Sequence, residues 1–287
     1  MGTVSNSESG PIGGESRGRK IHRQRGRALG MWPGREVRCR DLTIVTGASG
    51  NHFRCLGNLL ASIAHFEPVV RTLVYDLGLS APQRAAFPRH ANQWLRAFPF
   101  ERHPGWIKIK NGGEKASRCG YWAWKPVIMQ DALLEFGGPA LWLDAGDLLT
   151  GALDELRRVL DSQGVYSPAS NGTVARWTHP ETLERLLAGS ETLGRPNRNA
   201  AIIGLNPARA AGREIARRWR ESCLDRRCIA PAGASLANHR YDQAVLTVLI
   251  YQAQREYGFT LVDRRLNVSY HNDHLPAWNR GQPCCNI

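Results

Sequence analysis

The sequence predicts an α/β fold. Short apolar runs alternate with longer segments whose apolar residues recur at helical spacing. The first three elements follow the order strand, helix, strand, which is the order of a parallel pair joined by a right-handed crossover. With 287 residues, 42% of them hydrophobic and 22% charged, the chain is long enough to bury a sizeable core.

The first predicted strand covers residues 42–47 and leads into a tight turn at 48–51. A helix over 52–66 places Leu56, Leu59 and Ile63 on one face. The second strand covers 69–75 and is ended by Asp76 and Gly78. The following elements are a helix from Ser80 that breaks near Pro88, and strand candidates at 93–98 and 106–110.

The second half of the chain continues the alternation. Residues 115–120 are expected to form a polar, basic loop, followed by a helix over 126–136 in which Pro126 suits the first turn. The apolar run at 141–143 is the next strand. The elements predicted after it are helices at 152–160, 180–187 and 207–223, strands at 165–166, 174–177, 201–205 and 259–262, and a long helix capped by Asn238 that ends near Glu256.

About half of the net charge of +13 lies in residues 1–40, which hold nine Lys or Arg against three Glu. This segment is rich in Gly, Ser and Arg, so we expect a solvated, disordered tail, or alternatively the remnant of a targeting or stem segment. A basic surface suits phosphate-bearing ligands, nucleic acid or anionic membranes. No nucleic-acid-binding motif is present, so we expect no nucleic acid partner.

The sequence is compatible with more than one cellular compartment. The sequence has no apolar run of about 18 residues, as a transmembrane helix requires, and no signal-peptide core. A complete chain would be cytoplasmic, and a chain that lacks its anchor would belong in the Golgi lumen. Cys223 and Cys228 could bridge in an oxidising compartment, or be buried free thiols. The sequence does not indicate an oligomeric state.

Two carboxylates follow the apolar strand at 141–143. Asp144 comes directly after it, and Asp147 follows Gly146. Ligands of open α/β sheets bind at the carboxyl ends of the strands, and carboxylate oxygens suit Mg²⁺ or Mn²⁺. The alternative is that Asp144 caps the next turn and Asp147 is solvated.

A glycine-rich turn follows the first strand, with the sequence Thr46-Gly47-Ala48-Ser49-Gly50. It resembles the opening of short-chain dehydrogenases, and Tyr121 and Lys125 match the Tyr-x-x-x-Lys of that family. The match fails because the glycine pattern stops at Asn51 and because Pro126 places Tyr121 and Lys125 across a helix start. An NAD(P)-dependent oxidoreductase is therefore the less favoured alternative.

The segment 115–125 mixes cations and flat rings: Lys115, Arg118 and Lys125 with Tyr121, Trp122 and Trp124. Rings can stack on the CH faces of a sugar, and fixed cations can neutralise a diphosphate. Alternatively, both tryptophans belong to the core and the cations are solvated.

Two more segments carry candidate ligands. Asp242 and Gln243 lie at the start of the last long helix, where they could hold sugar hydroxyls or serve as plain capping residues. Near the C-terminus, His271 or His274 could complete an oxygen-rich metal site, or be solvated.

In this order, four segments resemble the GT-A fold of nucleotide-sugar glycosyltransferases: residues 42–67, 121–126, 141–147 and 238–249. The layout is similar to that of family-8 glycosyltransferases and closest to an uncharacterised family of GT-A-like domains. The resemblance spans about residues 40–275. It implies a single Rossmann-related domain over 41–287, with a mixed central sheet flanked by helices.

The resemblance also implies roles for residues. The implied donor is a nucleotide sugar, with a UDP-linked sugar expected. The residues implied to contact it are Thr46, Gly47, Ala48, Asp76, Arg118, Tyr121 and Asp144. Those implied to hold Mn²⁺ (or Mg²⁺) are Asp144, Asp147 and His271. Because Gly146 stands where the family has a second aspartate, either Asp147 reaches the metal or metal binding is altered or lost.

The implied reaction is transfer of a hexose from the donor to a hydroxyl of a glycan, protein or small molecule. Asp242 and Gln243 would position the donor sugar, and Lys125 would stabilise charge on the leaving diphosphate. An inactive or metal-independent sugar-nucleotide-binding protein is the alternative that Gly146 favours.

Overall fold

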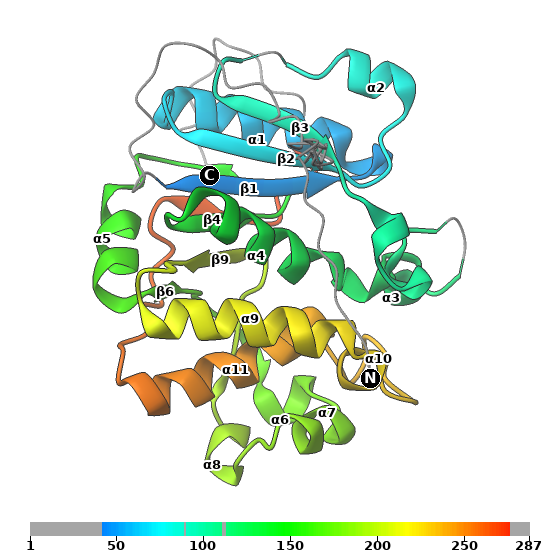
Figure 1. The fold of residues 1–287 in the computed structure, drawn as a ribbon, viewed down its shortest axis with the longest axis vertical. Helices are drawn as coiled ribbons and strands as arrows, with labels where there is room; N and C mark the ends of the chain where they lie inside the picture. The colour runs from blue at the N-terminus through cyan, green and yellow to red at the C-terminus, as the bar shows by residue number, and fades with distance from the viewer. Residues whose placement is uncertain (1–41, 89, 111–112, 276–287) are drawn as a thin grey trace, which may run out of the picture. The chain divides into compact units, whose positions relative to one another are not determined.

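A computed structural model of the chain describes residues 42–88, 90–110 and 113–275 (Figure 1). The predicted basic tail, residues 1–40, lies outside the described residues and stays a prediction. The main sheet has six strands in the order β3-β2-β1-β4-β9-β6. Their bounds are β1 Thr43–Ala48, β2 Arg71–Asp76, β3 Gln93–Ala97, β4 Ala140–Leu143, β6 Val165–Tyr166 and β9 Ile202–Leu205.

The central sheet is mixed, which confirms the predicted fold class. β1 pairs in parallel with β2 and β4, and β2 pairs in parallel with β3. β9 is antiparallel to both β4 and β6. The predicted crossover unit is present as β1, helix α1 (Phe53–Phe66) and β2. The carboxyl ends of β1, β2 and β4 therefore lie at one edge of the sheet.

Helices cover both faces of the sheet. On one face, Ile44 and Leu141 pack in a core with α1 and α5 (Asp154–Gln163). On the other, Val45 and Trp142 pack with α4 (Trp124–Phe136), α9 (Ala210–Leu224) and α11 (Asp242–Tyr257). α11 lies alongside α9 (Figure 1). Because both faces are covered, these strands read as continuous apolar runs rather than as alternating patterns.

Two small antiparallel sheets were not predicted. β5 (Leu148–Leu149) pairs with β10 (Val268–Ser269), and β7 (Ala169–Thr173) pairs with β8 (Pro196–Arg198). The first pairing brings residues 268–275 back to the end of β4, where the Asn272 amide donates to the Gly146 carbonyl at 2.8 Å. The remaining helices are α2 Ala81–Ala85, α3 Lys115–Arg118, α6 Val174–Trp177, α7 Pro180–Arg185, α8 Ser190–Leu193 and α10 Arg226–Ile229.

Two predicted strands are helical turns instead. In the predicted strand at 106–110, the chain makes a 3-10 turn, η3 (Gly105–Ile107). In place of the strand at 174–177 the structure has α6, because the Thr173 hydroxyl accepts the Arg176 amide and caps a helical turn.

Two more predictions are wrong at 115–120 and 259–262. The expected loop at 115–120 contains the short helix α3 and continues into a 3-10 turn, η4 (Gly120–Trp122). The segment 259–262 has no strand assignment. The carbonyl of Phe259 accepts a hydrogen bond from the Gln254 side chain rather than from a neighbouring strand.

The long C-terminal helix starts later than predicted. Asn238 does not cap it, because its side-chain oxygen accepts the Ser235 amide at 2.8 Å within a preceding turn. The residue before the helix is Tyr241, with φ 48° and ψ −118°. The helix proper begins at Asp242, which places that carboxylate at the first turn.

Within the described part of the chain, none of the helices has the length and apolar character needed to cross a bilayer. Cys223 and Cys228 are buried and free. Of the two alternatives that the sequence left open for this pair, the structure has the free thiols.

Candidate functional site

Lys125 joins three segments that lie far apart in the sequence. Its side chain is 3% exposed and stands in the first turn of α4. The ammonium lies 2.9 Å from Asp144 Oδ1, directly after β4, and 3.6 Å from Asp242 Oδ2, at the start of α11. It also donates to the Ala200 carbonyl at 3.0 Å. The structure thus brings together the acidic strand end, the basic-aromatic segment and the start of the last helix.

The electrostatics keep Lys125 charged. Burial acts to lower the pKa of the ammonium, but Asp144 and Asp242 outweigh burial and raise it above its ordinary value. An ammonium has three donors, and here they face Asp144, Asp242 and the Ala200 carbonyl. Lys125 therefore holds the two carboxylates in place, and its charge acts on a ligand through them.

Asp242 is the unsatisfied member of this cluster. It is buried, and its Oδ2 accepts no hydrogen bond from the residues that the structure describes. Burial raises the pKa of Asp242 to about 7, although Lys125 acts in the opposite direction. Buried polar atoms without a partner are uncommon, and a buried carboxyl with a raised pKa is typical of functional sites.

Asp144 is the accessible member. Its Oδ1 accepts hydrogen bonds from the Trp142 indole at 2.6 Å and from Lys125, while the side chain as a whole is 42% exposed. A ligand at the carboxyl end of β4 can therefore contact Asp144 without displacing its neighbours. A residue that serves only as a turn cap would bind the amides of its own turn with its side chain. The Asp144 side chain instead contacts Trp142 and Lys125.

Asp147 is held in the turn after β4. It is 1% exposed, and its Oδ2 accepts the Asp144 amide at 3.0 Å. Burial, followed by the charge of Asp144, raises the pKa of Asp147 well above its ordinary range. The alternative of a solvated Asp147 is therefore wrong, since this side chain shapes the loop that presents Asp144.

Gly146 makes room for a carboxylate that sequence reasoning missed. A Cβ at position 146 would lie 2.3 Å from Oδ1 of Asp273, so an aspartate at this position would displace the Asp273 carboxylate from its present place. The Asp273 carbonyl accepts a hydrogen bond from Arg54 at 3.1 Å, which ties the C-terminal segment to α1. The sequence gives no signal for this contact, because it depends on the unpredicted pairing of β5 with β10.

The described residues do not fit the predicted Mn²⁺ or Mg²⁺ site. Asp144 already faces the Lys125 ammonium, Asp147 is buried with Oδ2 on a backbone amide, and His271 is exposed. Over residues 42–275, apart from the three that are not described, no group of three His, Cys, Asp or Glu side chains is placed to hold a metal ion. The cation beside Asp144 in this arrangement is Lys125.

The residues predicted to lie against the nucleotide base belong to the interior of β1. Thr46 is fully buried, with no hydrogen-bond partner for its hydroxyl among the described residues, and Ala48 is buried as well. Gly47 packs against Leu77, whose Cδ1 would lie 2.9 Å from an added Cβ. The strand runs through Ala48, and the turn that follows contains a 3-10 segment, η1 (Gly50–His52).

Asp76 is the other residue of this part of the fold that was predicted to contact the nucleotide sugar. Its carboxylate oxygens are engaged by groups of the protein itself. Its Oδ1 accepts the amides of Gly78 and Leu79, and its Oδ2 accepts Arg84 Nε at 2.6 Å. Burial alone would raise the pKa of Asp76, but these hydrogen bonds outweigh it and lower the pKa. This geometry is that of a turn-stabilising carboxylate.

An aromatic wall, formed by Trp106, Tyr121, Trp122 and Tyr241, stands beside the charged cluster. Ring centroids lie 5.4 Å apart for Tyr121 and Tyr241, and 6.0 Å apart for Trp122 and Tyr241. Of the two tryptophans that the alternative assigned to the core, Trp124 is buried there and Trp122 is only half-buried. Tyr121 is half-buried as well. Partly exposed rings next to carboxylates are suited to stacking on a sugar.

The backbone of the aromatic wall is strained. Tyr121, Trp122 and Tyr241 have φ of 55°, 58° and 48°, a region that costs about 1–3 kcal/mol for a residue with a side chain. Gly120, at φ 60°, starts this run, and a Cβ there would lie 1.9 Å from the Ile107 carbonyl oxygen. The strain falls directly before Lys125 and Asp242, the two residues that the wall helps to position.

Two other predicted residues lie near these elements. Arg118 is exposed at the end of α3, and Lys115 is exposed at its start. Gln243 is half-buried in the first turn of α11, and no side-chain hydrogen bond engages its amide among the described residues. All three are therefore available to a ligand.

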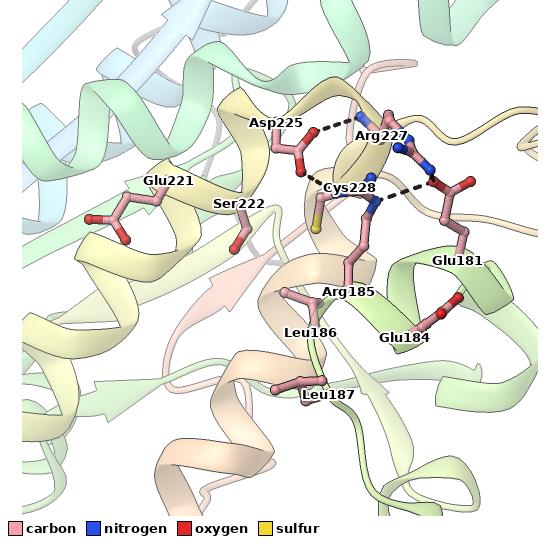
Figure 2. Close-up of a pocket in the computed structure, with 10 residues that line it drawn as sticks. All are labelled: Glu181, Glu184, Arg185, Leu186, Leu187, Glu221, Ser222, Asp225, Arg227 and Cys228. Atoms are coloured by element: carbon pink, nitrogen blue, oxygen red, sulfur yellow. Dashed lines mark hydrogen bonds and ion pairs between the residues drawn. The ribbon is translucent and has the colours of Figure 1, made fainter.

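A cavity of about 660 Å³ lies elsewhere, between α7, the end of α9 and α10 (Figure 2). Four of its charged side chains pair with one another: Arg185 with Glu181 and Asp225, and Arg227 with Glu181. None of the site residues predicted from sequence lines it.

No protein-family model matches the sequence, and no curated protein matches it. Among solved structures, the chain is similar to the galactosyltransferase LgtC in complex with donor and acceptor sugar analogues, at 17% identity and a TM-score of 0.48, over 83% of this chain and 90% of that one. It is also similar to mouse xyloside xylosyltransferase 1, at 11% identity and a TM-score of 0.44, over 78% and 84% of the two chains.

A further similarity is to the bifunctional glycosyltransferase WbbM, at 14% identity and a TM-score of 0.46. It covers 76% of this chain, which spans only 39% of the WbbM structure. All three structures are named as glycosyltransferases, the class that the sequence resembles. Similarities of this size do not by themselves establish a family, an activity or a ligand for this chain.

Proposed function

We propose that this protein transfers a hexose from a UDP-linked sugar to a hydroxyl acceptor. The observation that carries the proposal is the cluster around Lys125, in which one carboxylate is accessible and the other is buried with one oxygen, Oδ2, that accepts no hydrogen bond from the described residues. The cluster lies where β4 ends, beside rings that can stack on a sugar. These features together suit a ligand that is rich in hydroxyl groups and carries a diphosphate.

Each side chain has a distinct task in this proposal. Asp144 contacts the ribose or the sugar, and Asp242 with Gln243 positions the hexose hydroxyls. Arg118 and Lys115, exposed on α3, neutralise the diphosphate as the bond between the anomeric carbon and the phosphate oxygen breaks. The acceptor hydroxyl oxygen forms the new bond to the anomeric carbon and releases its proton to water, and UDP leaves with the electron pair of the broken bond.

The metal requirement separates two versions of the proposal. The sequence resemblance predicts Mn²⁺ or Mg²⁺, whereas the position of Lys125 beside Asp144 favours a reaction in which protein cations alone stabilise the diphosphate. We favour the metal-independent version, because Lys125 already offsets the charge of Asp144 and because Asp147 is buried with its Oδ2 on a backbone amide.

The first experiment is a thermal-shift titration of the full chain with UDP, with and without Mn²⁺. A ligand at about 100 times its Kd stabilises the folded state by about 2.7 kcal/mol. We expect UDP to raise the melting temperature equally in both conditions. A larger shift with Mn²⁺ would support the metal-dependent version, and no response to any nucleoside diphosphate would contradict both. Stabilisation by NADP⁺ and not by UDP would instead support the oxidoreductase alternative.

The second experiment measures hydrolysis of a panel of UDP-sugars by the Asp144→Ala variant. We expect the variant to fold and to lose hydrolysis, because Asp144 is the accessible carboxylate of the cluster. The matched control is Asp154→Ala, which removes a carboxylate that is 81% exposed on α5. Unchanged turnover in Asp144→Ala would remove this residue from the mechanism.

A further inference from the structure

Two guanidinium groups lie against the ring of Trp177. Arg240 Cζ is 3.6 Å from the ring centroid, and Arg176 Cζ is 4.8 Å from it. The Arg240 amide also donates to the Trp177 carbonyl at 3.0 Å. This bond ties the end of α6 to the residue that precedes Tyr241 and the start of α11.

The two arginines lack an acidic partner. Among the described residues, no carboxylate forms an ion pair with either of them, and the one side-chain hydrogen bond of Arg240 goes to the Leu236 carbonyl. Burial lowers the pKa of Arg240, and the charge of Arg176 lowers it further. Two cations that share one indole repel each other, and each cation–π contact returns only about 0.5–1 kcal/mol.

A second stacked arginine, Arg195, lies in the same part of the fold and does not share its ring with another cation in the described part of the chain. Arg195 Cζ lies 3.8 Å from the ring centroid of Tyr251, and its Nη2 donates to Gln254 Oε1 at 2.7 Å. Around the cavity, Arg185 and Arg227 are paired with carboxylates. Arg195 has a neutral partner and no carboxylate among the described residues, so the feature that sets Arg176 and Arg240 apart is that two guanidinium groups share one ring without an anion between them.

The Arg176–Trp177–Arg240 cluster adjoins the proposed active site. Arg240 precedes Tyr241, whose ring contacts Tyr121 and Trp122 of the aromatic wall, and Asp242 follows. Arg176 is exposed and Arg240 is half-buried, so both can be reached from solvent. The Tyr241 ring between them is fully buried, so a molecule whose hydroxyl reaches the anomeric carbon near Asp242 would extend to the arginines over the surface that covers this ring.

We propose that Arg176 and Arg240 form an anion-binding subsite for the acceptor, which is a saccharide that carries a carboxylate or a phosphate. The inference rests on the proposed glycosyl transfer. Each guanidinium offers a planar fork of donors that matches two oxygens of either acid. Trp177 holds the forks in place before the acceptor arrives, and the acid removes the repulsion between them.

The experiment measures binding of four probes to the full chain by isothermal titration, in the presence of UDP: glucose, glucuronate, glucose 6-phosphate and inorganic phosphate. The variants are Arg176→Gln, Arg240→Gln and Arg240→Lys, with Arg195→Gln as the matched control. UDP affinity and melting temperature are measured for each variant. We expect at least one acidic saccharide to bind the wild type about tenfold or more tighter than glucose, since hydrogen bonds to charged groups are worth this much.

The same acidic saccharide should bind both Gln variants about tenfold more weakly than the wild type. Its affinity for Arg240→Lys should lie between these two values, because lysine keeps the charge but lacks the planar pair of guanidinium donors. Arg195→Gln should bind as the wild type does. UDP affinity should not change in any of the variants. Whether glucuronate or glucose 6-phosphate binds more tightly identifies the acid.

Three outcomes would overturn the inference. If UDP binds but acidic and neutral saccharides bind alike, the subsite is wrong while the proposed function stands. If inorganic phosphate binds as tightly as glucose 6-phosphate, the arginines hold a free anion and not an acceptor. If UDP does not bind at all, the proposed function fails, and a loss of acid binding in the Gln variants would then show an anion site with no role in glycosyl transfer.

Discussion

Asp76 and Asp144 have the same local sequence pattern and opposite surroundings. Asp76 is the last residue of β2 and Asp144 directly follows β4, and each stands two residues before a glycine, Gly78 in one case and Gly146 in the other. Asp76 accepts two amides of its own turn and the Arg84 side chain. Asp144 accepts hydrogen bonds from Trp142 of its own strand and from Lys125 of α4, and its side chain stays 42% exposed.

The two aspartates differ in which side chain accepts the backbone amides of the turn. After β2, the Asp76 carboxylate itself accepts the turn amides, so it has little capacity left for a ligand. After β4, Asp147 accepts the Asp144 amide and performs that task instead, which leaves Asp144 free to face outward. An aspartate at a strand end is thus a ligand-binding candidate only when another residue stabilises its turn.

The largest expected effect is that of Lys125→Met. Removing this ammonium leaves two carboxylates together, one of them buried, so we expect a loss of about 3–5 kcal/mol in the free energy of unfolding. Urea denaturation followed by circular dichroism measures it. The control Lys115→Met, at an exposed position, should change stability by less than about 0.5 kcal/mol. A loss below 1 kcal/mol for Lys125→Met would show that the cluster tolerates the missing charge.

Asp76→Ala should cause the next largest loss in the free energy of unfolding. It leaves the amides of Gly78 and Leu79 without their acceptor, which costs about 2 kcal/mol. Arg84→Ala should cost less than about 1 kcal/mol, because Arg84 is 49% exposed and solvent replaces its ion pair. UDP binding should survive both substitutions. Loss of UDP binding in a folded Asp76→Ala variant would restore the role that the sequence resemblance gave this residue.

Asp242→Asn tests the buried carboxyl through pH. The pKa of Asp242 is about 7 in the folded state against 3.8 for an ordinary aspartate, so the folded state holds the proton more tightly. The stability from this group is complete below about pH 4 and is lost as pH rises through 7. Relative to the Asn variant, the wild type should therefore lose at most about 1.4 kcal/mol per pH unit in this window.

The comparison must be made between the two proteins, because His239 contributes the opposite slope. Burial lowers the pKa of His239 to about 4, so its neutral form stabilises the folded state above pH 6.5 and that stability is lost as pH falls toward 4. His239 is present in both proteins, and its effect cancels in the difference. Parallel pH profiles for wild type and Asp242→Asn would contradict a raised pKa at Asp242.

Asp144→Asn should have the smallest effect on stability and sharpen the contrast with Asp76. The amide oxygen can still accept hydrogen bonds from Lys125 and Trp142, and 42% of the Asp144 side chain is exposed to solvent that screens its charge, so we expect a change below about 1 kcal/mol. Hydrolysis of the UDP-sugar that the wild type accepts should nevertheless fall sharply. A variant that is as active as the wild type would place the reaction elsewhere.

Much of the fold follows from periodicity, because apolar runs that are buried on both faces are strong signals. The strands β1, β2, β4 and β9 and the long helices α1, α4, α9 and α11 are all recognisable in this way. The short elements are not. Residues 174–177 form a helix through one hydroxyl cap, and residues 148–149 and 268–269 pair only with each other. These outcomes depend on single contacts that no periodic pattern encodes.

The sequence by itself determined the alternation of strands and helices, and with it the position of Asp144 at a strand end and of Asp242 at a helix start, since these depend on local hydrophobic patterns. Only the tertiary structure decided that Lys125 binds both, that Asp76 is fully engaged, and that Asp273 occupies the space beside Gly146. The physical reason is that the state of a carboxylate depends on burial and on the donors around it. For Asp144 and Asp242 the decisive donor, Lys125, comes from another part of the chain, and for Asp76 the donors are local but are positioned only once the turn has folded.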